Sequence, residues 1–143
     1  EKITEGLDGL RERLQNYYKL GARFTKWRGV YNISDKYPSK LSIHSNAHAL
    51  ARYSALVQEC GMVPIVEPEV LMDGDHSAET CFNKTSEVIK KCFEELIIHK
   101  IARAHIYIRV HVMNIFFCKL FFIFMLFHLI FFMSFFLFIF FAQ

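Results

Sequence analysis

Residues 62–69 read Met-Val-Pro-Ile-Val-Glu-Pro-Glu, a short apolar run that ends in two carboxylates. The run 62–66 is typical of a buried parallel strand, and the charges after it indicate where such a strand emerges at a polar surface. Residues 23–31 alternate in part between apolar and polar, and their aromatic and β-branched side chains favour an extended chain. We therefore predict two strands.

Helical patterns precede, separate and follow these strands. Apolar residues at helical spacing predict helices over residues 8–20, 43–57 and 81–96, and Gly21 and Gly61 mark the ends of the first two. The order helix, strand, helix, strand, helix predicts βαβ units and a parallel sheet, which is an α/β fold. This pattern fits a (β/α) barrel and a doubly wound sheet alike.

The composition changes near residue 99. All 14 acidic residues lie at or before Glu95, and residues 96–143 contain four charges, all of them Lys or Arg. Up to His99 the chain has 13 basic and 14 acidic residues, which gives no electrostatic basis for nucleic-acid binding. The chain is therefore divided into a folded segment, 1–99, a basic and apolar junction, 100–119, and a hydrophobic segment, 120–142.

The hydrophobic segment 120–142 admits two interpretations. Its 23 residues exceed the roughly 20 that a helix needs to cross a bilayer, and they are apolar except for His128 and Ser134. All nearby positive charges precede it, so an anchored chain would keep its folded segment in the cytosol. However, 13 of the 16 phenylalanines lie between residues 116 and 141, which favours translated noncoding sequence over a natural anchor. Both interpretations predict aggregation or membrane insertion.

Charged residues follow or interrupt both predicted strands. Lys26 and Arg28 are two residues apart, as are Glu67 and Glu69, so each pair shares one face of its strand. Catalytic groups of (β/α) barrels lie at the carboxyl ends of strands, where adjacent strands would bring these cations beside these carboxylates. Such a group suits a phosphorylated or polyhydroxylated substrate, with the cations neutralising charge and a Glu transferring protons. A structural salt-bridge cluster explains the same spacing equally well.

Two further groups have the spacing of metal ligands, and we assign a metal to neither. His44 and His48 lie four apart on a predicted helix, but the sequence shows no third ligand, which favours a solvated helix face. Asp73, Asp75 and His76 are explained by a Gly-containing acidic turn.

Several common motifs are absent from the sequence. It contains no P-loop, no GxGxxG and no GxSxG, so nucleotide binding and serine hydrolysis have no positive signal. It also shows no signal peptide and no CxxC pair among its four cysteines, which predicts reduced thiols and a cytoplasmic protein.

Five short runs together resemble one enzyme family. The runs are GLDGL (6–10), ARFTKWR (22–28), LARY (50–53), VPIVEPE (63–69) and DGDH (73–76). In order and spacing they resemble class I fructose-bisphosphate aldolases, continuously over about residues 1–98. The resemblance implies a (β/α)8 TIM barrel, of which this chain would supply about two strands, the fourth and fifth, with their flanking helices. The chain would then be an interior fragment, joined to an unrelated Phe-rich and helical tail.

The resemblance also implies an activity. Members of this family are glycolytic lyases that reversibly cleave fructose 1,6-bisphosphate to dihydroxyacetone phosphate and glyceraldehyde 3-phosphate. They do so through a lysine Schiff base, without a metal or cofactor, and are commonly homotetramers. By motif, Lys26 corresponds to the lysine that assists proton transfer and charge stabilisation, and Arg28 to an arginine that contacts substrate. Glu67 corresponds to the glutamate that acts as acid and base, and Glu69 to its supporting carboxylate. Thr25 stands where the family usually has Ala.

One departure from the family concerns the Schiff-base lysine itself. The family carries it in a Leu-Lys-Pro-Asn-Met motif soon after the last of these helices, whereas residues 100–114 here read KIARAHIYIRVHVMN. Neither Lys100 nor Lys119 matches that lysine in position or flanks. We therefore expect this chain to be inactive as written. The alternative is a noncatalytic, membrane-anchored protein that uses its partial barrel as an interaction module.

Overall fold

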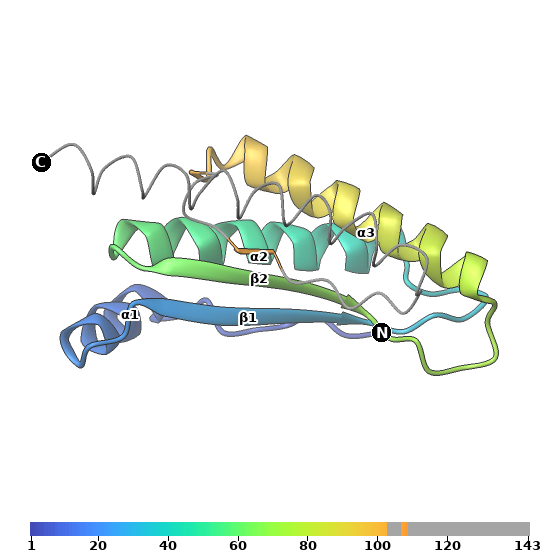
Figure 1. Ribbon diagram of the computed structural model, residues 1–143, viewed down its shortest axis with the longest axis horizontal. Helices are drawn as coiled ribbons and strands as arrows, with labels where there is room; N and C mark the ends of the chain where they lie inside the picture. Colours follow the sequence, from blue (N-terminus) through green and yellow to red (C-terminus); the bar gives the residue numbers. More distant parts are fainter. Residues whose placement is uncertain (103–106, 109–143) are drawn as a thin grey trace, which may run out of the picture. The chain divides into compact units, whose positions relative to one another are not determined.

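The computed structural model describes residues 1–102 and 107–108. They form helices and strands in strict alternation, with every strand parallel to its neighbour. The elements are α1 (Leu10–Lys19), β1 (Phe24–Tyr31), α2 (Lys40–Glu59), β2 (Val63–Val70), α3 (Ala78–Ile98) and β3 (Tyr107–Ile108) (Figure 1). The five elements predicted from the sequence are confirmed. The expectation of about two parallel strands with flanking helices is confirmed, and a two-residue strand, β3, which the sequence did not predict, pairs with β2.

Serine caps explain why α2 and α3 begin before the apolar patterns that predict them. The side chain of Ser39 accepts a hydrogen bond from the backbone N–H of Ser42, and Ser77 does the same for Thr80. Each cap satisfies a backbone donor that the first helical turn leaves open. At the other end of α2, Gly61 has a φ of 73°, a left-handed conformation that suits glycine.

The strand β2 is longer than the apolar run that predicts it. It continues through Glu67 and Glu69 to Val70. The sequence predicted that these carboxylates follow the end of the strand, whereas in the structure they lie within it. The ladder to β1 is framed by N–H donation from Val63 to the Arg23 carbonyl and from Leu71 to the Tyr31 carbonyl. Because N–H groups alternate in direction along a strand, both prolines of β2 direct their missing donors away from β1. The prolines therefore leave this ladder intact.

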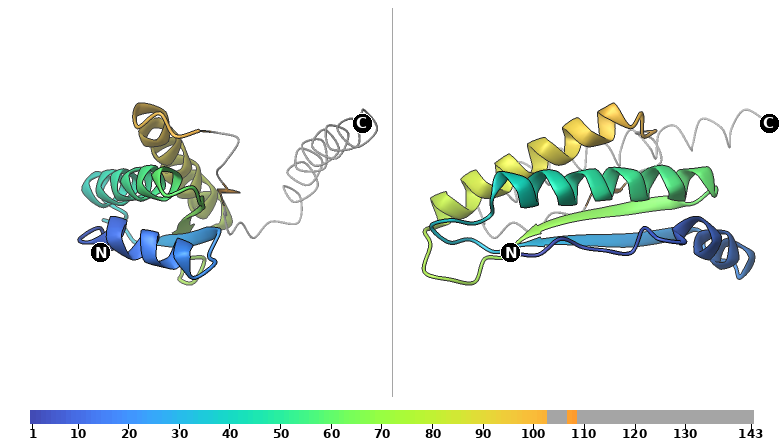
Figure 2. Two further views of the ribbon diagram at one scale, coloured as in Figure 1. Left: turned by 90° about the vertical axis from the view of Figure 1, so that its left-hand side faces the viewer. Right: turned by 180° about the vertical axis from the view of Figure 1, so that it is seen from behind.

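Helices α2 and α3 lie side by side and run back against the strand direction (Figures 1 and 2). Helix α2 contacts β1, β2 and α3, whereas α1 packs against α2. The core between these elements is apolar and includes Leu14, Leu50, Val57, Val66 and Val88, each at most 1% exposed. Because helices cover one face of the strands, residues at alternate positions are left on the other face.

Thr25 occupies a position that the family pattern gives to Ala, and here its hydroxyl has a partner. Its Oγ1 lies 2.6 Å from the hydroxyl of Tyr53 on α2, which also donates a longer bond of 3.5 Å to the Ile65 carbonyl. Burial raises the pKa of Tyr53 to about 12, against the opposing effect of these two hydrogen bonds. Thr25 thus ties β1 to the helix that covers it.

Replacing Thr25 by Ala is expected to lower the free energy of unfolding by about 1–3 kcal/mol, because the buried Tyr53 hydroxyl loses its short hydrogen bond. Urea unfolding followed by circular dichroism measures the change. The double variant Thr25→Ala/Tyr53→Phe removes both polar partners and should lose less than the single variant. A single variant as stable as the parent chain would contradict this account of Thr25.

The hydrophobic segment 120–142 lies outside the described residues, as does most of the 100–119 junction. Within residues 1–102, no helix combines the length and the apolar character needed to cross a bilayer. The expectation of a helical, membrane-associated tail therefore stays a prediction.

Candidate active site

The face of β1 that points away from the helices carries Lys26 and Arg28. The alternation of side chains directs Thr25 and Trp27 toward α2, where the Trp27 and Tyr53 rings lie 5.2 Å apart. Lys26 and Arg28 consequently lie on the opposite face, with side chains 45% and 50% exposed. Local strand geometry alone fixes this separation of polar and apolar groups.

The strand register places Arg28 directly opposite Glu67. Nζ of Lys26 lies 2.7 Å from Oε2 of Glu67, and Nε of Arg28 lies 4.0 Å from the same oxygen. Arg28 also donates a hydrogen bond to Glu69. The prediction that adjacent strands bring these cations beside these carboxylates is confirmed.

Burial distinguishes the two acids from the two bases. Glu67 is 1% exposed and the side chain of Glu69 is 12% exposed, whereas both cations reach solvent. A hydrogen bond with Glu69 raises the pKa of Arg28, against the smaller opposing effect of desolvation, so Arg28 is a permanent cation. The group is therefore a buried carboxylate in contact with an ammonium that faces outward.

This geometry supports two kinds of chemistry. Nζ of Lys26 and Oε2 of Glu67 lie 2.7 Å apart, so both can act on one group of a ligand bound beside them. The exposed ends of Lys26 and Arg28 present positive charge to an anionic ligand. A ligand with both phosphate and hydroxyl or carbonyl groups matches this combination.

The lysine nearest in sequence to the expected Schiff-base motif lies in a helix-ending turn. The backbone N–H of Lys100 donates to the carbonyl of Ile97, and its φ of 53° is left-handed, so Lys100 closes the carboxyl end of α3. Lys119 lies outside the described residues. In the described part of the chain, no lysine follows α3 within a strand.

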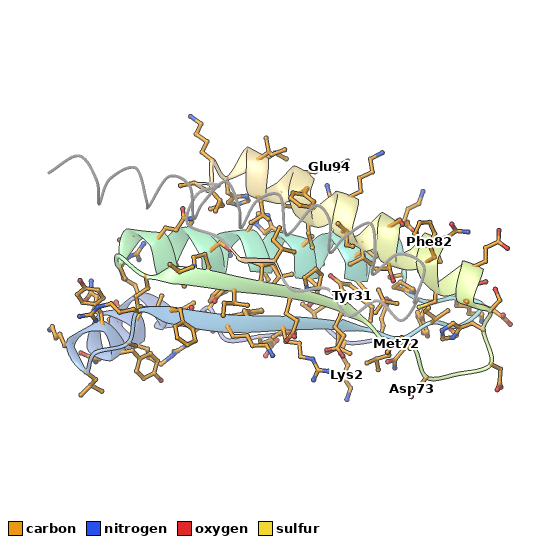
Figure 3. All side chains as sticks on the ribbon, in the orientation of Figure 1. Lys2, Tyr31, Met72, Asp73, Phe82 and Glu94 are labelled. Atoms are coloured by element: carbon orange, nitrogen blue, oxygen red, sulfur yellow. The ribbon has the colours of Figure 1, made fainter. Side chains whose placement is uncertain are left out.

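The two groups of residues that have the spacing of metal ligands lie in different surroundings in the structure. Asp73 and its neighbours Asp75 and His76 lie in the loop between β2 and α3, where Figure 3 shows Asp73 at the carboxyl end of the strands. His44 and His48 instead face α3, where the carboxylate of Glu95 lies between them. The sequence analysis did not identify Glu95 as a partner of these histidines, because a charged residue on a helix is usually expected to face solvent. In the structure Glu95 is buried against α2.

The ionisation of Glu95 reflects opposing effects. Burial of its side chain, which is 5% exposed, by itself raises the pKa. Hydrogen bonds from Lys91 and His48, together with the charge of Lys91, outweigh burial and lower the pKa below its usual value. The carboxylate is therefore ionised at neutral pH.

Comparisons with known proteins agree on one family. The family described as fructose-bisphosphate aldolase class-I matches residues 1–114, which extends beyond the resemblance over 1–98. A probable fructose-bisphosphate aldolase class 1 of Xanthomonas campestris is 60% identical over 96 residues, which are 67% of this chain and 29% of that protein. The cytosolic fructose-bisphosphate aldolase 4 of Arabidopsis thaliana is 50% identical over 101 residues, 71% of this chain and 26% of that protein.

A solved structure supports the same relationship. Fructose-bisphosphate aldolase from Plasmodium falciparum, crystallised in complex with TRAP and a small-molecule inhibitor, has a TM-score of 0.75 and 46% identity. The match covers 77% of this chain and 32% of that one. The chain thus spans less than a third of the length of the curated relatives described above.

Proposed function

Because the chain belongs to the class I fructose-bisphosphate aldolase family, we propose that residues 1–99 supply part of the active site of an enzyme that cleaves fructose 1,6-bisphosphate. The products are dihydroxyacetone phosphate and glyceraldehyde 3-phosphate, and the reaction is reversible. The contact between Lys26 and Glu67 carries this proposal, because it places a proton donor on β1 and a proton acceptor on β2 2.7 Å apart on one face of the sheet. The site uses a substrate Schiff base and needs no metal or cofactor.

The four charged residues form two pairs, Lys26 with Glu67 for proton transfer and Arg28 with Glu69 for substrate binding. Glu67 transfers protons while the substrate carbonyl becomes a Schiff base. Lys26 assists this proton transfer and stabilises the negative charge that develops on the substrate. Arg28 contacts the phosphorylated sugar, which its exposed guanidinium can reach. Glu69 fixes the position of Arg28 through their hydrogen bond, because that bond limits the rotation of a long side chain.

Formation of the Schiff base requires a lysine that this chain lacks at the expected position. Residues 100–114 contain one lysine, Lys100, which belongs to the turn after α3. We therefore propose that this polypeptide is catalytically inactive by itself and that its site is functional only within a complete barrel. The name of the Arabidopsis relative describes it as cytosolic, and we propose the same location for that enzyme. We also propose that it is a homotetramer, as the family resemblance implies.

A chimera tests the proposal directly. The 96 matched residues of the Xanthomonas campestris relative are replaced by the corresponding residues of this chain. The chimera is expected to cleave fructose 1,6-bisphosphate, because residues 1–99 supply a site compatible with the rest of that barrel. The 143-residue chain alone is expected to show no cleavage.

Borohydride trapping tests separately whether the chimera forms a Schiff base and whether the chain alone does not. Borohydride reduces a Schiff base with dihydroxyacetone phosphate to a stable amine, which mass spectrometry detects. The chimera should gain the label and the 143-residue chain should not. A chimera that folds by circular dichroism but neither cleaves nor labels would refute the proposed site, and a labelled 143-residue chain would refute its inactivity.

A further inference from the structure

Helices α2 and α3 each present two potential metal ligands one helical turn apart. His44 and His48 are four residues apart on α2, and Glu95 and His99 are four residues apart at the end of α3. Residues at this spacing lie on one face of a helix, and the two helices pack against each other. The packing brings these two pairs together, although His48 and Glu95 are 47 residues apart in the sequence.

The distances between these side chains are short. Oε2 of Glu95 lies 3.1 Å from Nδ1 of His48 and 4.0 Å from Nδ1 of His99. Candidate ligand atoms of these three residues all lie within 4.8 Å of one another. His44 adds a fourth group, with its Nδ1 3.4 Å from Oε1 of Glu95. Ligands that share a zinc ion lie about 2 Å from it, so only small side-chain rotations are needed to enclose one.

We propose that His48, Glu95 and His99 form a zinc-binding site that joins α2 to α3, with His44 or water completing the coordination. Imidazole nitrogen and carboxylate oxygen are ligands that zinc accepts, and a three-ligand set leaves one position of a tetrahedron open. This site lies on the helices, whereas the Lys26–Glu67 site lies on the uncovered face of the strands. Its role is structural and independent of the proposed aldolase chemistry.

The surroundings of the ligands are suited to holding them in place. Nδ1 of His99 also lies 2.9 Å from the backbone carbonyl of Glu95, a contact that fixes the position of the ring. When Nδ1 carries the proton and donates to this carbonyl, the zinc ligand is the other ring nitrogen, Nε2, and not the Nδ1 whose distance is given above. Lys91 contacts Oε1 of Glu95 at 3.0 Å, so Oε2 remains the oxygen on the side of His48 and His99. Hydrogen bonds to a ligating carboxylate are a common feature of metal sites.

The charges around the site include one that opposes a cation. Lys91 is positive, and its Nζ also lies 3.5 Å from Oε2 of Glu94. Figure 3 shows Glu94 on the side of α3 that points away from the strands. Glu94 therefore offsets part of the repulsion between Lys91 and a bound metal. The side chain of His48 is 45% exposed, so a hydrated ion can enter from solvent.

Metal titration of the full chain tests this site. Zinc binding is measured by competition against cobalt, whose visible spectrum reports nitrogen and oxygen coordination. We expect one zinc per chain and an upward shift of the thermal midpoint when zinc is added. His48→Gln and His99→Gln should each weaken zinc binding by at least about tenfold, because each removes a direct ligand.

His76→Gln provides the matched control, because it removes a histidine from the loop between β2 and α3 and not from the helix pair. The control should bind zinc like the parent chain and keep the thermal shift. Circular dichroism establishes that each variant folds. The proposal is overturned by the absence of saturable zinc binding, or by folded His48→Gln and His99→Gln variants that bind zinc as tightly as the control.

Discussion

Replacing Glu67 by Gln in the aldolase chimera is expected to lower kcat by about 10²–10⁴-fold, the usual contribution of a general acid or base. Gln has the shape of Glu but cannot exchange a proton at neutral pH. Its amide can still hydrogen-bond in the buried position, so the fold should persist. Steady-state cleavage of fructose 1,6-bisphosphate measures the loss, and the dependence of kcat on pH shows whether a titrating group has been removed.

Glu59→Gln is the matched control for this substitution. Glu59 also forms an ion pair with an arginine, Arg11, at 2.8 Å, but it lies at the end of α2 and is exposed. The control should leave kcat unchanged. A folded Glu67→Gln chimera with the kcat of the control would show that the buried carboxylate only supports the structure, which is the salt-bridge interpretation of the sequence.

Replacing Lys26 by Met in the chimera is expected to lower kcat by about 10²–10³-fold, the cost of removing one group that stabilises charge in a transition state. Met retains the length of the side chain but removes the ammonium that contacts Glu67. KM should rise less than kcat falls, because Arg28 continues to supply positive charge for binding. Steady-state kinetics separates these two effects.

The double variant Lys26→Met/Glu67→Gln tests whether the two residues act as a unit. Groups that act together have strongly non-additive effects, so the double variant should lose little more activity than the worse single variant. Losses that simply multiply would show that Lys26 and Glu67 act in separate steps. That result would contradict the shared proton transfer inferred from their 2.7 Å contact.

Local physical chemistry explains why much of this chain could be predicted from its sequence. The helices follow from apolar residues at helical spacing, and the strands from short runs of apolar and β-branched residues. The shared face of Lys26 and Arg28, and that of Glu67 and Glu69, follows from the two-residue period of a strand. The family motifs then identified the chemistry that these four residues could support. The tail after residue 108 lies outside the described residues, so its origin stays a prediction.

Only the tertiary structure decided which groups meet. The pairing of Arg28 with Glu69 depends on the register between β1 and β2, which no spacing within one strand reveals. The contact of His48 with Glu95 joins residues 47 apart, and it exists because the apolar faces of α2 and α3 pack at one particular rotation. Helix periodicity fixes the face on which a residue lies but not the helix that covers that face. For this reason the sequence determined the elements and the charged strand face, and packing between distant segments determined the ion pairs and the proposed zinc site.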